Sequence, residues 1–285
     1  MLNEFTRRSL IVLICALTAC TADRSSAADE ADQACVPIGA AKALPQLPEA
    51  SGLTLSRRTS GRLWTLNDSG PPVIYALDSS GGVQGSVQIT NATVEDWEDI
   101  TAGPCPGGSC LYIADIGDNN TARRTITVYR LPEPQPAEQR TAPADAVIAR
   151  YPDGPHDAEA VFVTPDSRIF IITKEDGAGL YRFPQAGTGT QVTLEKVANL
   201  PMKRVTDADV SADGNWVAVR SNQEVGFYRT SDLVVGKPTG ITASLAAAQE
   251  PQGEGIALAA DGTLYLVSEG SGGGRFSTMR CNLPR

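Results

Sequence analysis

The stretch GEGIALAADGTLYLVSEG, residues 253–270, contains two apolar segments separated by the turn sequence Ala-Asp-Gly. Alternating apolar residues on either side of a glycine-containing turn are typical of a β-hairpin. Glu254 precedes the first segment and Glu269 ends the second. The stretch therefore predicts two paired strands with carboxylates at the open end of the hairpin.

Four earlier stretches repeat this pattern of a polar start, an apolar strand, a tight turn and a second strand: residues 49–68, 97–119, 157–176 and 207–222. A third strand follows each hairpin. The first strands begin their apolar runs at Leu53, Ile100, Val161, Val210 and Ile256, at intervals of 47, 61, 49 and 46 residues. The long interval contains the proline-rich segment 131–145, which we interpret as a loop insertion. A period of this length indicates a repeat architecture.

The two chain ends together supply one further unit. Twenty-nine residues follow Ile256, and 18 separate Cys35 from Leu53, which together match one 47-residue interval. A unit divided between the termini is typical of a β-propeller, an all-β ring whose N-terminal strand completes the last four-stranded blade. We predict five such blades in residues 35–285, with six as the alternative. A two-sheet sandwich would not explain the divided unit.

The six cysteines fall into three groups. Cys15 and Cys20 lie near the N-terminus, Cys105 and Cys110 enclose the turn sequence PGGS, and Cys35 and Cys281 lie near the two ends of the repeat region. Four cysteines allow three pairings. Because the turn brings Cys105 and Cys110 close, we predict that they pair, and that Cys35 and Cys281 lock the ring. A metal site made by these cysteines, the alternative to disulfides, is disfavoured because the chain has one histidine and no CxxC motif.

The N-terminal residues resemble a bacterial lipoprotein signal. Arg7 and Arg8 precede the apolar run 10–19, which at about ten residues is too short to span a bilayer. LTAC (17–20) resembles a lipobox, which implies cleavage after residue 19 and lipidation of Cys20. Residues 20–34 are small and polar and are predicted to form a flexible tether. An ordinary signal peptide is the alternative. We expect an exported, envelope protein whose membrane contact is the lipid.

The chain is acidic, with 33 Asp and Glu against 24 Lys and Arg and a formal net charge of −9. After removal of residues 1–19, the counts are 32 and 22, and the net charge is −10. A surface of this sign is a poor partner for nucleic acid and for anionic lipid. We therefore expect a small-molecule or protein ligand instead.

Propeller geometry places the acidic residues together. The loop that enters a blade's first strand and the loop that leaves its second strand lie on one face, so carboxylates from all blades are expected around one axial opening. Carboxylate and carbonyl oxygens suit Ca²⁺. The predicted cation ligands are Glu98, Asp99, Glu159, Asp207, Asp209, Glu254, Asp115 and Asp118. The alternative is structural: these carboxylates accept hydrogen bonds from backbone N–H groups and order the loops.

A hydrolase is the second functional hypothesis. In it, Glu98, Glu159 and Glu254 would hold a cation or act as acid and base, and Lys174 and Arg220 would bind an anionic substrate such as a phosphate or a sugar acid. No Gly-x-Ser-x-Gly motif occurs, and a single histidine, His156, disfavours a Ser-His-Asp triad. We expect His156 to be a solvated loop residue and Trp97 to pack between blades.

Several segments together resemble the SdiA-regulated and phytase-like esterase propellers of bacteria: SGL (51–53), LWTLNDSG (63–70), IYALDSSGGVQGSVQI (74–89), EDWEDI (95–100) and EGIALAADGTLYLVSEG (254–270). The two ADG turns, 212–214 and 260–262, also resemble TolB-type repeats. The resemblance implies a secreted or envelope propeller with acidic residues at its axis, in some members with calcium. Such propellers often have six blades.

Overall fold

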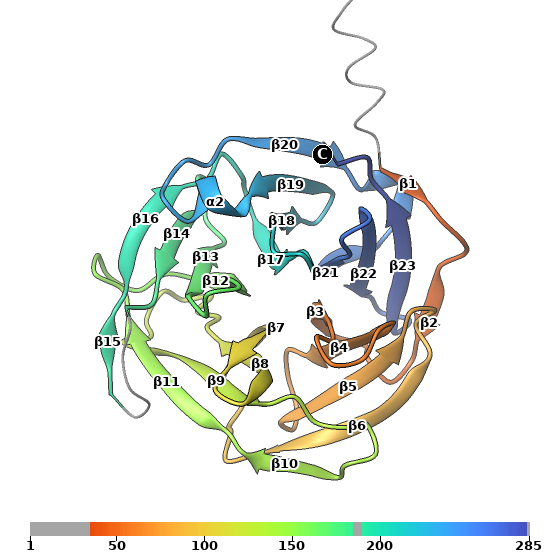
Figure 1. Cartoon of the computed structure of the whole chain (residues 1–285), viewed down its shortest axis with the longest axis horizontal. Helices are drawn as coiled ribbons and strands as arrows, with labels where there is room; N and C mark the ends of the chain where they lie inside the picture. Colours follow the sequence, from red (N-terminus) through yellow and green to blue (C-terminus); the bar gives the residue numbers. More distant parts are fainter. Residues whose placement is uncertain (1–34, 185–189, 284–285) are drawn as a thin grey trace, which may run out of the picture. The chain divides into compact units, whose positions relative to one another are not determined.

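The computed structural model describes residues 35–184 and 190–283 and forms a ring of five β-sheets (Figure 1). These residues belong to one compact unit, Gln33–Arg285. The innermost strands contact one another in the order β3, β7, β12, β17 and β21, and β21 returns to β3. The predicted five-bladed propeller is thus confirmed. The expected signal segment, Cys20 and the tether lie outside the described residues.

Each blade is an antiparallel sheet that begins at the axis and ends at the rim. Blade 1 contains β3 (Ala50–Leu55), β4 (Arg62–Asn67), β5 (Val73–Asp78) and β6 (Val83–Thr90). Blade 2 contains β7 (Trp97–Cys105), β8 (Gly108–Asp115), β9 (Ile126–Pro132) and β11 (Asp145–Arg150). Blade 3 contains β12 (Ala158–Val163), β13 (Ile169–Thr173), β14 (Gly179–Arg182) and β16 (Glu195–Asn199).

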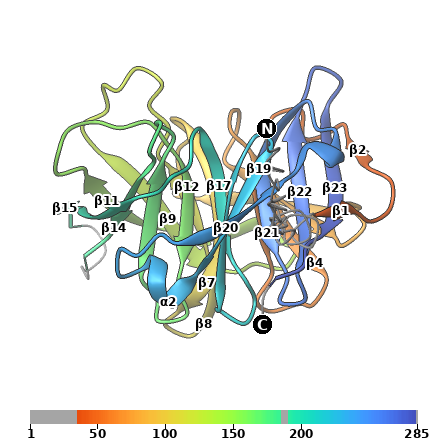
Figure 2. The ribbon, with the colours of Figure 1, turned by 90° about the horizontal axis from the view of Figure 1, so that it is seen from above.

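Blade 4 contains β17 (Val205–Val210), β18 (Trp216–Ser221), β19 (Glu224–Arg229) and β20 (Gly240–Ser244). Blade 5 contains β21 (Gln252–Leu258), β22 (Thr263–Glu269) and β23 (Gly274–Arg280), and its outer edge is built from the N-terminal strands β1 (Val36–Pro37) and β2 (Lys42–Leu44). Two short helical turns, α2 (Thr230–Leu233) and the 3₁₀ segment Ala246–Ala248, flank β20. Seen from the side, the inner strands cross the ring from one face to the other (Figure 2).

The hydrophobic core is divided into five clusters, one at each interface between neighbouring blades. Both faces of a blade are therefore apolar, because each face packs on a different neighbour. Trp97 illustrates this arrangement: it is fully buried with Trp64 and Leu66 of blade 1, and its indole N–H donates to the Thr93 carbonyl at 2.8 Å. The expected packing of Trp97 between blades is confirmed.

The ring closes where the two ends of the chain meet. Val36 and Pro37 pair with Arg280 and Met279, and Cys35 forms a disulfide with Cys281 across 246 residues of sequence. Both predicted disulfides are present, since Cys105 also pairs with Cys110. Disulfides are typical of proteins that fold in an oxidising compartment outside the cytosol. Within the described residues, no helix has the length and apolar character needed to cross a membrane.

Two blades carry a fifth strand that comes from the next blade. β10 (Arg140–Pro143) leaves blade 2 between β9 and β11 and pairs in parallel with β6 of blade 1. β15 (Val192–Thr193) leaves blade 3 in the same way and pairs with β11 of blade 2. The expected loop in 131–145 is therefore partly a strand that joins two blades.

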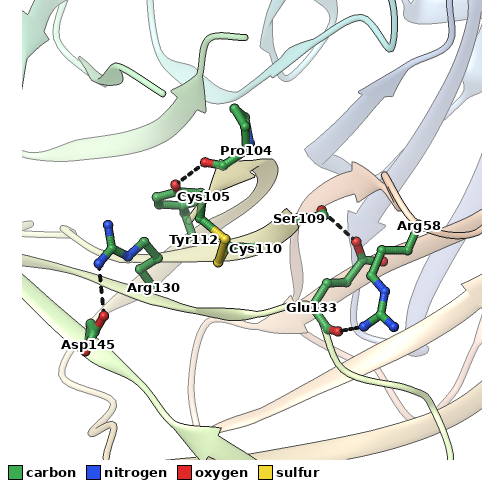
Figure 3. Close-up of a disulfide and its surroundings, with 9 residues drawn as sticks. All are labelled: Arg58, Pro104, Cys105, Ser109, Cys110, Tyr112, Arg130, Glu133 and Asp145. Atoms are coloured by element: carbon green, nitrogen blue, oxygen red, sulfur yellow. Dashed lines mark hydrogen bonds and ion pairs between the residues drawn. A yellow bond between two sulfur atoms is a disulfide. The ribbon is translucent and has the colours of Figure 1, made fainter. Parts of the chain in front are cut away.

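Glu133, at the start of this connection, is buried at the interface of blades 1 and 2. Its carboxylate accepts hydrogen bonds from the indole N–H of Trp64 at 3.0 Å and from the Ser109 hydroxyl at 2.9 Å. The Arg58 guanidinium donates to its carbonyl (Figure 3). Beside it, the Cys105–Cys110 disulfide closes the β7–β8 hairpin, and the Tyr112 hydroxyl donates to the Pro104 carbonyl at 2.7 Å. This region anchors the insertion on the face that carries the hairpin turns.

The two disulfides are expected to contribute unequally to stability. In the chain-entropy model, the Cys35–Cys281 bond, which closes a loop of 246 residues, stabilises the fold by roughly 5 kcal/mol, and the five-residue Cys105–Cys110 loop by about 2 kcal/mol. Denaturant unfolding of the double variants Cys35→Ser/Cys281→Ser and Cys105→Ser/Cys110→Ser measures the difference. An equal loss in both double variants would contradict a covalent lock at the seam.

Candidate functional site

A β-bulge occurs at the equivalent place in every innermost strand. The register with the second strand shifts once in each blade, which leaves one extra residue near the start of the first strand: Gly52, Glu98, Glu159, Thr206 and Glu254. Gly52 has a φ of +48°, and a Cβ there would lie 2.6 Å from the Ile100 backbone nitrogen. Bulges redirect side chains and are frequent beside functional sites. Three of the five bulged residues are glutamates, the three that sequence reasoning proposed as acid, base or cation ligand.

These glutamates, with the charged residues beside them, form what we term the axial mouth: Asp68, Asp96, Glu98, Asp157, Glu159, Lys174, Glu254 and Glu269. Burial, followed by the charge of Asp96, raises the pKa of Glu98 to about 9. Burial also raises the pKa of Glu254. Glu159 is 5% exposed and forms an ion pair with Lys174. Glu98 therefore carries a proton at neutral pH, whereas Glu159 is matched by a cation.

Asp68, at the end of β4, adds a carboxyl from blade 1. Burial, followed by the charges of Glu49, Glu269, Glu254 and Asp96, raises its pKa to about 7. Its Oδ1 is buried and has no hydrogen-bond partner among the residues that the structure describes. Asp68 and Asp96 lie in loops that were expected to face the axial opening, but neither was among the eight predicted cation ligands. No motif marks these two aspartates in the sequence. The one indication of their role is that each lies next to the end of a strand.

Beneath the mouth, three fully buried aspartates join the innermost strands. Asp99 Oδ2 accepts the Val161 N–H of the next blade at 2.7 Å, and Asp207 Oδ2 accepts the Ile256 N–H at 2.5 Å. Asp207 also reaches across the ring to the Leu53 N–H at 3.1 Å. Asp209 accepts the Leu258 N–H at 2.9 Å. These three carboxylates thus hydrogen-bond to backbone, as the structural alternative expects.

Burial raises the pKa of both Asp99 and Asp207. Each lies in the field of the other carboxyl group, which raises the pKa of Asp207 further. Asp207 Oδ1 is buried, and within residues 35–184 and 190–283 no N–H or O–H group donates to it. A single proton on this pair satisfies both groups, because one protonated carboxyl donates to the other.

Arg57 closes the axis on the opposite face. Its guanidinium donates to the carbonyls of Val210 at 2.9 Å and Ala212 at 3.1 Å in blade 4, and to Ala102 at 3.4 Å in blade 2. The positive charge also lowers the pKa of Asp209, although burial has the larger and opposite effect. The two ends of the axis thus differ in charge: an arginine occupies this end, and the carboxyl groups lie at the mouth.

Arg220 lies inside the protein and not at the mouth. It is fully buried, and its guanidinium donates to the Gly255 carbonyl at 2.7 Å and to Glu250 at 2.8 Å. It also donates to the carbonyls of Ser221 and Asn222. In this arrangement Arg220 joins blades 4 and 5, and its donors are engaged within the protein.

Asp115 and Asp118 order the loop between β8 and β9. Asp115 accepts the N–H groups of Glu95 and Asp96 at 3.2 and 3.1 Å and pairs with Arg123 at 2.9 Å. Asp118 accepts the N–H groups of Ala122 and Arg123 at 2.9 and 2.8 Å. The eight predicted cation ligands thus lie in three places: the mouth, the axis and this loop. Across residues 35–184 and 190–283, no group of three His, Cys, Asp or Glu side chains has the arrangement of a metal site.

His156 is more constrained than a solvated loop residue. Its Nδ1 lies 2.7 Å from Glu175 and its Nε2 lies 3.0 Å from Asp153, and the Tyr181 hydroxyl donates to Asp153 at 2.9 Å. The imidazole packs edge-on against Tyr151, with ring centroids 4.9 Å apart. Its side chain is 22% exposed. Sequence reasoning missed this cluster because its members come from separate strands and loops.

The geometry defines a β-propeller with an acidic axial mouth. No family model matches the chain, and no curated protein matches it in sequence. Solved structures match it in fold. The chain is similar to the PQQ-bound aldose sugar dehydrogenase of Streptomyces coelicolor, with a TM-score of 0.50, 11% identity, and coverage of 87% of this chain and 100% of that one.

A streptogramin B lyase matches with a TM-score of 0.43, 14% identity, and coverage of 86% of this chain and 74% of that one. A gluconolactonase of Xanthomonas campestris matches with a TM-score of 0.42, 12% identity, and coverage of 87% and 96%. These neighbours are β-propeller proteins. At such low identity, the likeness concerns the fold alone.

The hydrogen bonds of Asp207 are expected to decide how tightly the ring is held. Asp207→Ala removes the acceptor of two buried N–H groups and should destabilise the protein by about 2–5 kcal/mol. Asp207→Asn keeps an acceptor oxygen and supplies N–H donors for Asp99, so it should cost less than 1 kcal/mol. Chemical denaturation at pH 7.5 measures both. Equal losses in the two variants would show that the backbone hydrogen bonds are not the stabilising feature.

Proposed function

We propose that this protein is an exported propeller whose axial mouth binds a divalent cation, Ca²⁺ in the first place, and presents it to a small-molecule or protein ligand. The observation that carries the proposal is the convergence of partly buried carboxyl groups from four blades, Asp68, Glu98, Glu159 and Glu254, with one lysine among them. Clustered carboxyl groups repel one another unless protons or cations neutralise them.

The chemistry of the mouth favours a hard cation. Its ligands are carboxylate oxygens, which suit Ca²⁺, whereas the soft thiolate and imidazole ligands of zinc or copper are not among its residues. Glu98, Asp68 and Glu254 hold protons more tightly than ordinary carboxyl groups do. A cation that enters the mouth would replace these protons, so its binding should strengthen as the pH rises.

A hydrolase at the same mouth is the second candidate. The observation that favours it is the different surroundings of two glutamates: burial raises the pKa of Glu98 to about 9, whereas Glu159 forms an ion pair with Lys174. A protonated carboxyl group beside a carboxylate that is paired with a cation can serve as the general acid and general base of a hydrolase. Phosphoesters and glycosides are the substrate classes that such a pair can cleave.

Calcium is expected to stabilise the purified full-length protein. At a concentration about 100 times the dissociation constant, it should raise the melting temperature by roughly 5–10 °C at pH 8 relative to chelator. The increase should be smaller at pH 5.5, because protons compete for the carboxylates. Glu98→Gln should abolish the increase. In chelator, the same variant should melt at or above the wild-type temperature at pH 8, because the substitution removes a group whose ionisation is disfavoured.

Glu138→Gln is the matched control. Glu138 is exposed and lies between β9 and β10, on the face of the ring opposite the axial mouth. This variant should respond to calcium as the wild type does. A calcium response that persists in Glu98→Gln would place the cation elsewhere. Turnover of aryl phosphates or aryl glycosides that Glu98→Gln abolishes, and that chelator leaves intact, would favour the hydrolase over the cation site.

We also propose that the chain is a lipoprotein anchored through Cys20, as the lipobox-like LTAC (17–20) suggests, and that it is related to the SdiA-regulated and phytase-like propellers that its motifs resemble. In bacterial cells that process lipoproteins, the wild type should incorporate radiolabelled palmitate and sediment with membranes. Cys20→Ala should do neither, while Cys15→Ala should behave as the wild type. Palmitate incorporation by Cys20→Ala would contradict the anchor.

A further inference from the structure

A second pocket, which shares no lining residue with the axial mouth, lies on blade 2 where the chain leaves it for blade 3. Its volume is about 280 Å³, and its lining comes from the start of β9, the end of β11 and the segment that leads to β12. Three arginines line it, Arg123, Arg124 and Arg150, together with Tyr151. No carboxylate is among its described lining residues. All the charged side chains that line the pocket are therefore arginines, in a chain whose net charge is −9.

The three arginines differ in how much of their hydrogen-bonding capacity the protein already uses. Arg123 is held in place by ion pairs with Asp115 at 2.9 Å and Glu95 at 3.3 Å and by the Gly117 carbonyl at 2.8 Å. Arg150 donates to the Thr193 hydroxyl at 3.0 Å. Arg124 is exposed and makes no hydrogen bond or ion pair with the described residues. One fixed and one free guanidinium therefore border the same small space.

Two buried polar atoms on the pocket's lining residues have no partner in the described part of the chain. They are Nε of Arg123 and the hydroxyl of Tyr151. Tyr151 is 8% exposed, and its ring is fixed by edge-on contacts with His156 and Tyr181. Leaving a buried donor unpaired is costly, so such atoms usually face a ligand or an ordered water. Both atoms can donate to an anion.

We propose that this pocket binds a small oxyanion of the phosphate type, with Arg123, Arg124 and Tyr151 as its ligands. Guanidinium groups bind phosphate oxygens through paired, charge-assisted hydrogen bonds, and several of them favour a dianion over a monoanion such as acetate. The volume is just below the range of about 300–1,000 Å³ typical of drug-sized ligands, which suits a phosphate group rather than a large molecule. The source is either free phosphate or the phosphoryl group of a small ester.

Inorganic phosphate is the probe for the test. Titration calorimetry on the purified full-length protein, at constant ionic strength, should show saturable binding of phosphate and weaker binding of acetate. Arg124→Ala should weaken phosphate binding at least tenfold. The matched control, Arg140→Ala, removes an exposed arginine on β10 and should bind phosphate as the wild type does. Glycerol 2-phosphate separates the two sources: tighter binding than phosphate indicates an ester, and weaker binding indicates free phosphate.

Tyr151→Phe gives an independent readout. It removes a buried hydroxyl that has no partner, so without phosphate its melting temperature should equal or exceed that of the wild type. Its phosphate affinity should nevertheless fall. Loss of affinity without loss of stability distinguishes a ligand contact from a packing role. The proposal is overturned if the wild type shows no saturable phosphate binding, or if Arg124→Ala binds phosphate as tightly as the wild type.

Discussion

The ring depends on carboxylates at its axis that accept backbone N–H groups from other blades. Asp99 and Asp207 occupy equivalent positions one residue after the bulge, and each accepts the equivalent N–H group, Val161 or Ile256, of the next blade. These contacts fix the innermost strands at the distance where the bulged glutamates face one opening. The acidity of the mouth is therefore a consequence of how the ring is held together, and cation binding at the mouth would build on that framework.

Much of the architecture was predictable because it follows from periodicity. Hairpin turns, the divided unit and the cysteine positions each depend on local sequence, and they led to five blades, the seam and both disulfides. The roles of individual aspartates and glutamates were harder to predict. A bulge adds one residue to a strand, so it reverses which face of the sheet each later side chain is expected to occupy. Alignment on apolar residues placed Leu53 one position and Val210 two positions away from the true equivalents of Ile100.

Other features depend on contacts between distant residues. Arg220 lies near the end of β18 and Lys174 directly follows β13, so the two looked alike in the sequence. The Arg220 side chain nevertheless turns inward, because Glu250 and the Gly255 carbonyl accept its hydrogen bonds. The pairing of β10 with β6 requires a neighbouring blade edge that no local pattern encodes. The rim pocket likewise combines residues from β9, β11 and the following segment, and no motif joins them in the sequence. Sequence reasoning thus locates the charged groups but does not assign their partners.

The strands exchanged between blades have a consequence for how the ring opens. Blade 2 lends β10 to blade 1, and blade 3 lends β15 to blade 2, so melting one blade removes an edge from the one before it. Repeat proteins usually fray unit by unit. Here blades 1 to 3 are linked into one cooperative block, and amide hydrogen exchange in all three should proceed through a shared opening event.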